Sequence, residues 1–354
     1  MLNFALVGCG RIAERHSDLL ANGQVEGARL KAVCDIDDDK AKLIGNRFKI
    51  PYYKDMHEMM SSESIDVVVV LTESGNHAKN VIDLAKYKKH IIVEKPMALS
   101  LNDADRMIEA CDLQGIRLFV IKQNRYNIPV QKLRSAIENK RFGKLVLGTV
   151  RVRWCRPQEY YDQASWRGTW EMDGGVLTNQ ASHHVDLLEW MMGSVESVQA
   201  MSTTALADIE TEDTAIVNLR FSNGALGIIE ATTAVRPKNL EGSLSIIGEK
   251  GSVVIGGFAV NEMKVWEFCD ETEDDRQVLE NFSENPPNVY GFGHKLFYEN
   301  VVNDLLNDQR KSVDGIEGRR SLELINAIYE SIETKKEVSL RFKPNFSKLG
   351  QKNA

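Results

Sequence analysis

The sequence predicts an α/β protein of two domains: a doubly wound parallel sheet, followed by an α+β domain built on an open, mostly antiparallel sheet. Over residues 1–120, short apolar runs alternate with helical patterns, as they do when helices cover both faces of a parallel sheet. From about residue 144 the runs are longer and tight turns join them, which is typical of antiparallel strands. The length of 354 residues suits two domains of ordinary size. We place these domains at residues 1–123 and 124–354.

Turn and helix signals define the elements of the second domain. Asn-Gly at 223–224 stands between two β runs, which is the strongest short-range signal of a hairpin. A strand is expected over 144–154 and a further turn at 248–251. Apolar residues recur at helical spacing over 296–305 and 322–332, so two helices are expected late in the chain. One face of the sheet is expected to stay open to water or to a partner subunit.

Composition and charge exclude several classes of protein. The net charge of −7 and the absence of a long basic run argue against nucleic acid as a partner. No apolar stretch approaches the roughly 20 residues that a membrane span requires, and the start of the chain reads as a strand that meets a glycine turn, not as a signal peptide. Five cysteines without a Cys-x-x-Cys spacing indicate reduced thiols. We therefore expect a cytoplasmic protein that binds neither nucleic acid nor membrane.

A glycine-rich turn follows the first expected strand, at residues 2–7. Gly8, Gly10 and Ala13 form a G-x-G-x-x-A pattern ahead of a helical segment. The first glycine allows a tight turn, the second lets the backbone approach a pyrophosphate, and the small alanine lets the helix pack on the strand. The N-terminus of that helix offers free N–H groups to phosphate. In this context the pattern predicts a dinucleotide-binding domain of the Rossmann type.

The end of the second expected strand, at residues 29–34, indicates which dinucleotide binds. This strand ends at Asp35, and an acid at this offset accepts a hydrogen bond from the adenosine ribose and repels a 2′-phosphate. Asp37, Asp38 and Asp39 add negative charge nearby. The expected cofactor is therefore NAD and not NADP. A structural turn beside a solvated acid is the alternative, and it accounts for fewer of these signals.

Two further strands end in polar residues, at the edge where open α/β sheets bind ligands. One leads into Thr72–His77, and the other leads into the sequence Glu94-Lys95-Pro96. Desolvation and a neighbouring charge can bring a lysine into the range of acid–base catalysis, and the proline restricts the backbone of the lysine. Lys95 is therefore a candidate catalytic residue. The alternative is a charged strand end before a helix.

A second group of chemically interesting residues lies in the later half of the chain. Asn179, His183 and Asp186 follow Gly174-Gly175 at a spacing of i, i+4 and i+7, which places them on one face of a helix. For His183 the alternative is a capping or core histidine. Adjacent histidines, here His183 and His184, cannot both face one ion from a helix, and no cysteine lies near them in sequence, so no metal site is expected.

Taken in order, these motifs resemble those of the Gfo/Idh/MocA oxidoreductases over nearly the whole chain. The resemblance implies a nicotinamide cofactor, a C-terminal domain whose open sheet mediates oligomers, commonly tetramers, and catalysis by Lys95 together with His183. It also implies a cis peptide bond at Pro96. The residues expected to bind the cofactor are Gly8, Gly10, Arg11, Ile12, Asp35, Thr72, Ser74, His77, Glu94, Lys95 and Gln123. Those expected to bind the substrate are Lys95, Arg156, Tyr161, Trp166, Arg167, Asn179 and His183.

A narrower group within the family shares further residues with this chain. Segments 122–125, 156–163, 178–183, 238–242 and 290–294 are similar to those of the bacterial UDP-N-acetyl-D-glucosaminuronate 3-dehydrogenases of lipopolysaccharide and O-antigen sugar synthesis. This similarity implies NAD-dependent oxidation of the C3′ hydroxyl of that sugar by a homotetramer. The alternatives are a dehydrogenase of another sugar or of inositol, an NAD-dependent glycoside hydrolase, and an NAD-binding regulator without redox activity.

One position departs from the family pattern, in which an aspartate often orients the active-site histidine. The matching position here is Asn179. An amide can hold His183 by a hydrogen bond, but it cannot stabilise an imidazolium as a carboxylate does. We therefore expect Lys95 to be the main base, and Asn179 and His183 to orient the substrate hydroxyl. The cationic candidates for the substrate's carboxylate and phosphates are Arg151, Arg153, Arg156 and Arg167.

Overall fold

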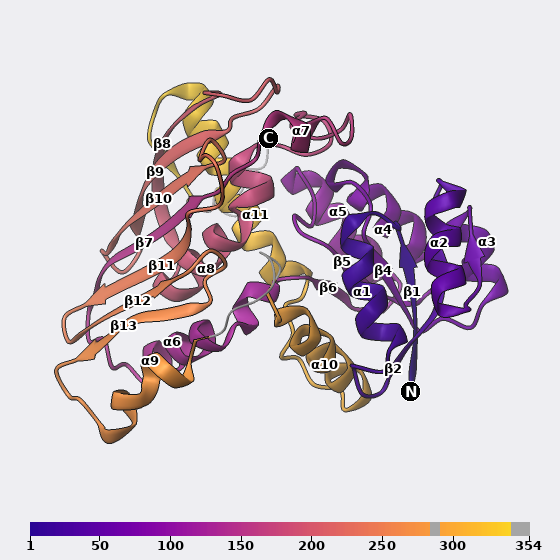
Figure 1. Ribbon diagram of the computed structural model, residues 1–354, viewed down its shortest axis with the longest axis horizontal. Helices are drawn as coiled ribbons and strands as arrows, with labels where there is room; N and C mark the ends of the chain where they lie inside the picture. Colours follow the sequence, from indigo (N-terminus) through magenta and orange to yellow (C-terminus); the bar gives the residue numbers. More distant parts are fainter. Residues whose placement is uncertain (284–290, 341–354) are drawn as a thin grey trace, which may run out of the picture.

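The computed structural model describes residues 1–283 and 291–340. Two lobes lie side by side, each built on one sheet (Figure 1). The first sheet has six strands and the second has eight. The parallel first sheet and the mostly antiparallel second sheet confirm the fold class that the sequence predicts.

The first sheet is parallel, with the strand order β3-β2-β1-β4-β5-β6. Its strands are β1 (Leu2–Val7), β2 (Ala28–Cys34), β3 (Tyr52–Tyr53), β4 (Val67–Val70), β5 (His90–Val93) and β6 (Leu118–Val120). Its helices are α1 (Arg11–Ala21), α2 (Asp38–Phe48), α3 (Met56–Ser62), α4 (His77–Ala85) and α5 (Leu101–Leu113), with a 3₁₀ turn η1 (Ser74–Asn76). The strand order changes direction between β1 and β4, and such a point opens a crevice at the carboxyl ends of the strands, where open sheets bind ligands.

The second sheet has the order β13-β12-β11-β7-β10-β9-β8-β14. Its strands are β7 (Leu145–Arg153), β8 (Val195–Thr203), β9 (Thr214–Phe221), β10 (Leu226–Thr232), β11 (Glu241–Gly248), β12 (Gly251–Gly256), β13 (Glu262–Phe268) and β14 (Val338–Ser339). Among them β7 and β10 pair in parallel, and the other described pairs are antiparallel. The hairpin expected at 223–224 joins β9 to β10, and the turn expected at 248–251 joins β11 to β12.

Helices cover one face of this second sheet, the face that looks toward the first lobe (Figure 1). The helices of this half are α6 (Ile128–Glu138), α7 (Gln158–Tyr161), α8 (Ser182–Met192), α9 (Val278–Asn281), α10 (Gly293–Leu306) and α11 (Gly315–Thr334). Three short turns accompany them: η2 (Gln123–Tyr126), η3 (Val176–Gln180) and η4 (Glu273–Gln277). Burial alternates along β9 and β10, and the outward positions include the exposed Ile216, Leu226 and Ile228. The open face that the sequence predicts is therefore present, and part of it is apolar.

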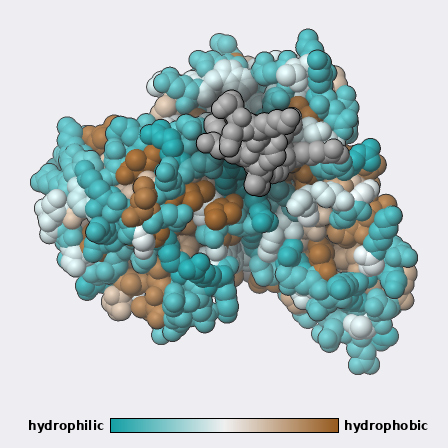
Figure 2. Space-filling view, turned by 180° about the vertical axis from the view of Figure 1, so that it is seen from behind, coloured by the Kyte–Doolittle hydropathy of each residue, from teal (hydrophilic) through white to brown (hydrophobic). Residues whose placement is uncertain are grey.

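The surface seen from behind is mostly hydrophilic, with hydrophobic residues in small groups (Figure 2). Among the described residues, no helix is long and apolar enough to cross a lipid bilayer.

The end of the chain returns to the first lobe. Helix α10 places Phe297, Tyr298, Val301 and Val302 in the same apolar cluster as β1, β2 and α1. The ring of Tyr298 meets that of Phe4 edge to face, with 5.7 Å between their centroids. Because this helix completes the core of the first lobe, the two lobes do not fold from separate halves of the sequence. The domain boundary at residue 123 stays a prediction.

A buried ion pair ties the end of the parallel sheet to the helices of the second domain. Arg125 in η2 donates two hydrogen bonds to Asp186 in α8, of 2.7 and 2.8 Å, and a third, of 3.0 Å, to Glu317 in α11. The Lys122 amine lies 3.3 Å from the same aspartate. Burial alone would raise the pKa of Asp186, but Arg125 and Lys122 hold it far below its ordinary value.

We predict that Asp186→Asn lowers the free energy of unfolding by about 3–5 kcal/mol, because it removes the charge to which the buried Arg125 makes two of its hydrogen bonds and leaves only the bond to Glu317. Since the folded-state pKa of Asp186 is depressed, this contribution is present above the unfolded-state pKa of about 3.9 and is lost as the pH falls below it. Urea denaturation measures both effects. The matched control is Asp105→Asn, which breaks an exposed Arg–Asp pair with Arg319 and should cost at most about 1 kcal/mol. Equal losses would contradict the prediction.

Candidate active site

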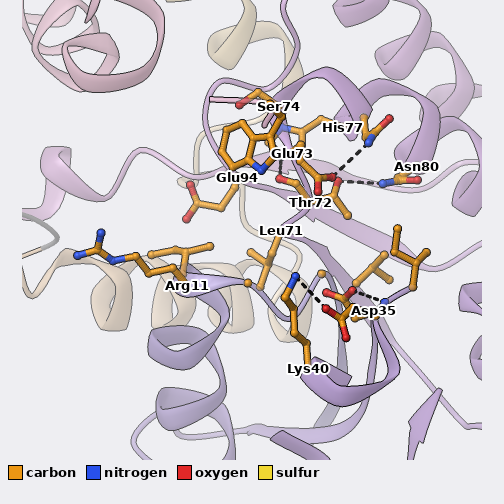
Figure 3. A pocket seen from close by; sticks show the side chains of 18 of the residues that line it. Arg11, Asp35, Lys40, Leu71, Thr72, Glu73, Ser74, His77, Asn80 and Glu94 are labelled. Carbon is orange, nitrogen blue, oxygen red and sulfur yellow. Dashed lines mark hydrogen bonds and ion pairs between the residues drawn. The ribbon is translucent and has the colours of Figure 1, made fainter. Parts of the chain in front are cut away.

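A cavity of about 920 Å³ lies at the carboxyl ends of β1, β2, β4 and β5. The strand ends bring Gly8, Asp35, Thr72 and Lys95 to its wall. The second domain closes the opposite side with Tyr160, Gln163, Ala164, Trp166, Arg167 and Asn179. Figure 3 shows the strand-end side, with Asp35 and Lys40 together at one end and Leu71 between them and Glu94 in this view. The cavity therefore spans the crevice between the two domains, and both supply residues to it.

The glycine-rich turn is shaped to admit a dinucleotide. Gly8 has a φ of +100°, and a Cβ there would lie 2.7 Å from the backbone of Leu71. A Cβ on Gly10 would meet no described atom within 4 Å, so the space above this residue is free for a ligand. Helix α1 begins at Arg11 without a side-chain cap, and its N-terminus is open to a phosphate group. These residues fit the pyrophosphate of NAD.

Asp35 is fixed at the end of β2 by the backbone around it. One carboxylate oxygen accepts a hydrogen bond of 2.7 Å from the N–H of Cys9, and the other accepts one of 2.8 Å from the N–H of Asp37. A carboxylate has about four acceptor sites, so these bonds orient it and leave room for ribose hydroxyls. Lys40 lies nearby but pairs with Asp37, at 3.2 Å.

All the residues that the sequence assigns to the cofactor line this cavity: Gly8, Gly10, Arg11, Ile12, Asp35, Thr72, Ser74, His77, Glu94, Lys95 and Gln123. His77 is the most buried of the loop residues, and its two ring nitrogens lie 2.7 Å from the carbonyl of Pro96 and 3.0 Å from that of Thr72. His77 therefore links the loop after β5 to the loop after β4 by hydrogen bonds. The Lys95–Pro96 peptide bond is cis, as the family resemblance implies.

The amine of Lys95 is held across the domain crevice. Its Nζ donates a hydrogen bond of 2.8 Å to the carbonyl oxygen of Asn179. Burial lowers the pKa of this amine below its ordinary value of 10.5, although Glu94 and Asp173 act in the opposite direction. A lysine with these surroundings can release and accept a proton nearer to neutral pH than an exposed lysine can.

The hydrogen bonds found for the side chain of Asn179 in the described part of the chain do not go to His183. This side chain donates a short hydrogen bond to Asp173 and accepts one of 3.2 Å from Gln180. Asp173, only 2% exposed, also accepts a hydrogen bond of 2.8 Å from the N–H of Gly168. A carboxylate therefore does reach Asn179, from a loop six residues earlier in the chain. The sequence shows Asp173 beside the Gly-Gly pair but does not indicate this contact.

His183 lies just beneath the cavity wall and does not line the cavity. The expected helix face is broken here, because Val176–Gln180 forms a π turn and α8 begins only at Ser182. Burial, with Lys95 and Lys122 nearby, lowers the pKa of His183 well below its ordinary value, so the imidazole is neutral. Its Nε2 finds no hydrogen-bond partner within the described part of the chain.

The expected substrate residues separate into two groups. Lys95, Trp166, Arg167 and Asn179 line the cavity, whereas Arg156, Tyr161 and His183 do not. The Tyr161 hydroxyl lies 3.0 Å from that of Thr233, and the neighbouring Tyr160 faces the cavity in its place. Which of two adjacent tyrosines on this four-residue helix faces the cavity cannot be told from the sequence alone, because no periodic pattern covers so short a segment.

The four arginines expected to bind the anionic groups of the substrate differ in where they lie. Arg167 lies against the rings of Tyr160 and Trp166, at 4.6 Å from each centroid, and its Nε is buried without a hydrogen-bond partner among the residues described. Arg156 bonds Gln180 behind the wall, at 3.1 Å. Arg151 and Arg153 point away from the cavity and pair with Glu230 and Glu241 across the sheet. Both glutamates lie on the strands that pair with β7, which carries the two arginines. The geometry therefore does not support the expected role of Arg151 and Arg153 in substrate binding.

Comparison with known proteins assigns both parts of the chain to one family. A model of the oxidoreductase family, NAD-binding Rossmann fold, matches residues 2–122, and one of the oxidoreductase family, C-terminal alpha/beta domain, matches residues 134–340. The myo-inositol 2-dehydrogenase of Thermotoga maritima is 30% identical over 350 residues, 96% of this chain and 98% of that protein.

Two solved structures are more similar still. The WlbA dehydrogenase from Bordetella pertussis, in complex with NADH and UDP-GlcNAcA, is 42% identical, with a TM-score of 0.89 over 97% of this chain and 99% of that one. The WlbA dehydrogenase from Chromobacterium violaceum, in complex with the same two molecules, is 43% identical, with a TM-score of 0.90 over 97% of each chain.

A turn that fits a dinucleotide, beside a partly buried lysine, is typical of a nicotinamide-dependent oxidoreductase. The chain belongs to the Gfo/Idh/MocA oxidoreductase family. It is an NAD-dependent dehydrogenase that acts on a CH–OH group.

The geometry at Asp35 predicts cofactor preference. We expect NAD to bind more tightly than NADP, because the fixed carboxylate repels a 2′-phosphate and loses its ribose hydrogen bond. Asp35→Ala should narrow the gap between the two affinities. Isothermal titration of both cofactors against both proteins measures it, and equal affinities in the unmodified protein would overturn the assignment of Asp35.

Proposed function

We propose that this protein oxidises the C3′ hydroxyl of UDP-N-acetyl-D-glucosaminuronate to a ketone. The observation that carries the proposal is the partly buried Lys95 amine, held at the carboxyl end of β5 in a cavity that extends to Trp166 and Arg167. The identity of 42–43% with two dehydrogenases that bind UDP-GlcNAcA supports the choice of sugar.

The chain's own residues supply the acid–base chemistry. When NAD is bound, it accepts the hydride from the sugar carbon. Lys95 in its neutral form takes the hydroxyl proton, so that the O–H and C–H bonds break while the carbonyl forms. The hydrogen bond to the carbonyl of Asn179 uses one N–H of the amine and fixes its direction, which a general base requires.

His183 and Asn179 have supporting roles in this proposal. His183 does not line the cavity, and because its pKa is far below its ordinary value, it is a poor proton acceptor near neutral pH. We therefore assign it a place behind the cavity wall and no contact with the reacting hydroxyl. Asn179 acts mainly through its backbone carbonyl, while its side chain is turned toward Asp173. We therefore assign the base to Lys95.

The anionic groups of the substrate are assigned to Arg167. Two phosphates and a uronate need fixed donors in a protein whose net charge is −7. Arg167 has a buried donor without a partner among the described residues, and the rings of Tyr160 and Trp166 hold its guanidinium in place. A planar guanidinium suits carboxylate and phosphate. Arg156 and Tyr161 support this wall from behind, through Gln180 and Tyr160.

We further propose that the reaction belongs to the synthesis of lipopolysaccharide and O-antigen sugars in the cytoplasm. The 3-keto product has the functional group that an aminotransferase needs, and it would be consumed by such an enzyme. The similarity of the chain to UDP-sugar dehydrogenases supports this placement.

Removal of the proposed base should abolish most of the turnover. Lys95→Met should lower kcat by about 10²–10⁴-fold and leave NAD binding largely intact. In the unmodified enzyme kcat/KM should rise with pH as the amine loses its proton, with a midpoint below 10.5, and this limb should be missing in the variant. Steady-state kinetics across a pH series measures both. Near-normal turnover by Lys95→Met would remove the lysine from this role.

A substrate panel tests the choice of sugar. NADH formation should be fastest with UDP-N-acetylglucosaminuronate and far slower with UDP-N-acetylglucosamine, because a site built around buried charge loses much when one partner is missing. Arg167→Gln should reduce kcat/KM for the uronate more than for the neutral sugar, and Arg151→Gln, outside the cavity, is the matched control.

The same panel separates the alternatives. If myo-inositol reacts faster than the UDP-uronates, the substrate assignment fails and the family assignment survives. Release of a free sugar without net NADH would indicate a glycoside hydrolase, and no reaction with any sugar would favour a regulator.

The open sheet face, together with the family resemblance, predicts a homotetramer. Its apolar residues would be buried by a partner subunit, so Ile216→Asp or Ile228→Asp should reduce the assembled mass. Leu43→Asp, at an exposed apolar position on α2 of the other domain, is the control and should leave the mass unchanged. Light scattering measures it, and a monomer mass for the unmodified protein at all working concentrations would refute the prediction.

A further inference from the structure

Glu94 is the acid of the Glu-Lys-Pro sequence, and it is buried among two histidines and a tyrosine. One carboxylate oxygen lies 3.1 Å from Nε2 of His16 and 3.5 Å from Nε2 of His294. The other oxygen accepts a hydrogen bond of 2.9 Å from the N–H of Lys95. Nδ1 of His16 lies 2.6 Å from the hydroxyl of Tyr298. We define His16, His294 and Tyr298 as the Glu94 anchor.

The His16 ring links the tyrosine to the carboxylate. Its Nδ1 lies at hydrogen-bond distance from the Tyr298 hydroxyl, and its Nε2 lies at hydrogen-bond distance from Glu94. Both histidines are fully buried, and burial lowers the pKa of His294. Burial alone would raise the pKa of Glu94, but the imidazole of His16, at hydrogen-bond distance, and that of His294, at 3.5 Å, bring it well below its ordinary value. Glu94 is thus an ionised carboxylate that the His16 ring and the N–H of Lys95 hold in place.

The order of the strands places this charge relative to the cofactor. Asp35, at the end of β2, marks the adenosine end of the cavity, and Gly10, at the end of β1, marks the pyrophosphate. Two strands farther along the sheet lies β5, whose end carries Glu94 and the proposed base Lys95, both on the cavity wall. Hydride transfer requires the nicotinamide to lie beside the substrate carbon and hence near Lys95. Glu94 is therefore at the nicotinamide end.

We propose that Glu94, fixed by its anchor, is an immobile negative charge that makes the site bind the oxidised cofactor more strongly, relative to the reduced cofactor, than it otherwise would. The nicotinamide ring is a cation in NAD⁺ and is uncharged in NADH. A buried anion attracts the cation and has no comparable effect on the neutral ring. His16, His294 and Tyr298 are positioning residues, because they act through Glu94. The inference depends on cofactor binding and not on the identity of the sugar.

A metal ion is an alternative occupant of the space between the side chains of His16, Glu94 and His294. The ligand atoms of His16, Glu94 and His294 lie within 4.8 Å of one another. However, the contact from His16 to Glu94 has the length of a hydrogen bond, and the second nitrogen of His16 is already engaged by Tyr298. The geometry favours a hydrogen-bonded carboxylate, and the metal becomes an outcome of the test.

The experiment measures the dissociation constants of NAD⁺ and NADH, without sugar, by titration calorimetry and NADH fluorescence. Glu94→Gln should raise the ratio Kd(NAD⁺)/Kd(NADH) by about tenfold, which corresponds to a rise of about 30 mV in the midpoint potential of the bound two-electron couple. His294→Ala should shift the ratio in the same direction by a smaller factor, and His294→Gln, which keeps an N–H donor, should restore much of it. A general loss of fold affects both constants and cancels in the ratio.

The matched control is Glu73→Gln, because Glu73 lines the same cavity but is partly exposed. Its ratio should change less than twofold. An unchanged ratio in Glu94→Gln, with both constants weakened equally, would overturn the proposal and leave Glu94 a simple ligand of the cofactor. A comparable shift in Glu73→Gln would also overturn it, since any nearby acid would then suffice. Stoichiometric zinc in the purified protein, lost in His294→Ala, would show a metal site instead. None of these results bears on which sugar is oxidised.

Discussion

The hydrogen bond from the Lys95 amine to the carbonyl of Asn179 is the contact on which the geometry of the site depends. The lysine comes from the end of a strand in one domain, and the carbonyl comes from a π turn in the other. A long side chain loses rotamer freedom when it is fixed, so the acceptor must itself be rigid. Glu212 provides this rigidity, because it accepts hydrogen bonds from the N–H groups of Val176 and Leu177, at 2.9 and 3.0 Å. Tyr329 of α11 then ties Glu212 to Thr178, with bonds of 2.9 Å each.

The charges around this contact oppose one another. Burial and two nearby cations disfavour the protonated amine, while Glu94 and Asp173 favour it. A catalytic base needs such a balance, because an amine that is too easily deprotonated is a weak base and one that is too strongly paired does not release its proton. Each of the two acids is held by its own set of residues. The Glu94 anchor holds Glu94, and hydrogen bonds from Gly168 and Asn179 hold Asp173.

The last helices of the chain contribute to both domains. Helix α10 completes the core of the parallel sheet and delivers His294 and Tyr298 to Glu94. Helix α11 packs on the second sheet, holds Arg125 through Glu317 and holds the π turn through Tyr329. Because one continuous segment spans the crevice, the distance between the strand ends and the second domain is fixed by packing and not by a flexible linker. A site that is assembled from both domains requires this constraint.

The sequence by itself determined the fold class and the NAD cofactor, and it singled out the glycine turn and the lysine to which we assign cofactor binding and proton transfer. Each of these depends on a local pattern: β-branched runs between helical segments, Gly8 and Gly10 ahead of a helix, Asp35 at a strand end, and Lys95 before a proline. Tertiary structure alone decided that the carbonyl of Asn179 and not its side chain meets Lys95, that Tyr160 and not Tyr161 lines the cavity, and that Arg153 pairs with Glu230 and Glu241. It also brought His16 and His294, 278 positions apart, to one carboxylate. Contacts between residues far apart in the chain are fixed by packing and by the requirement that buried polar groups form hydrogen bonds. Neither of these leaves a periodic signal in the sequence.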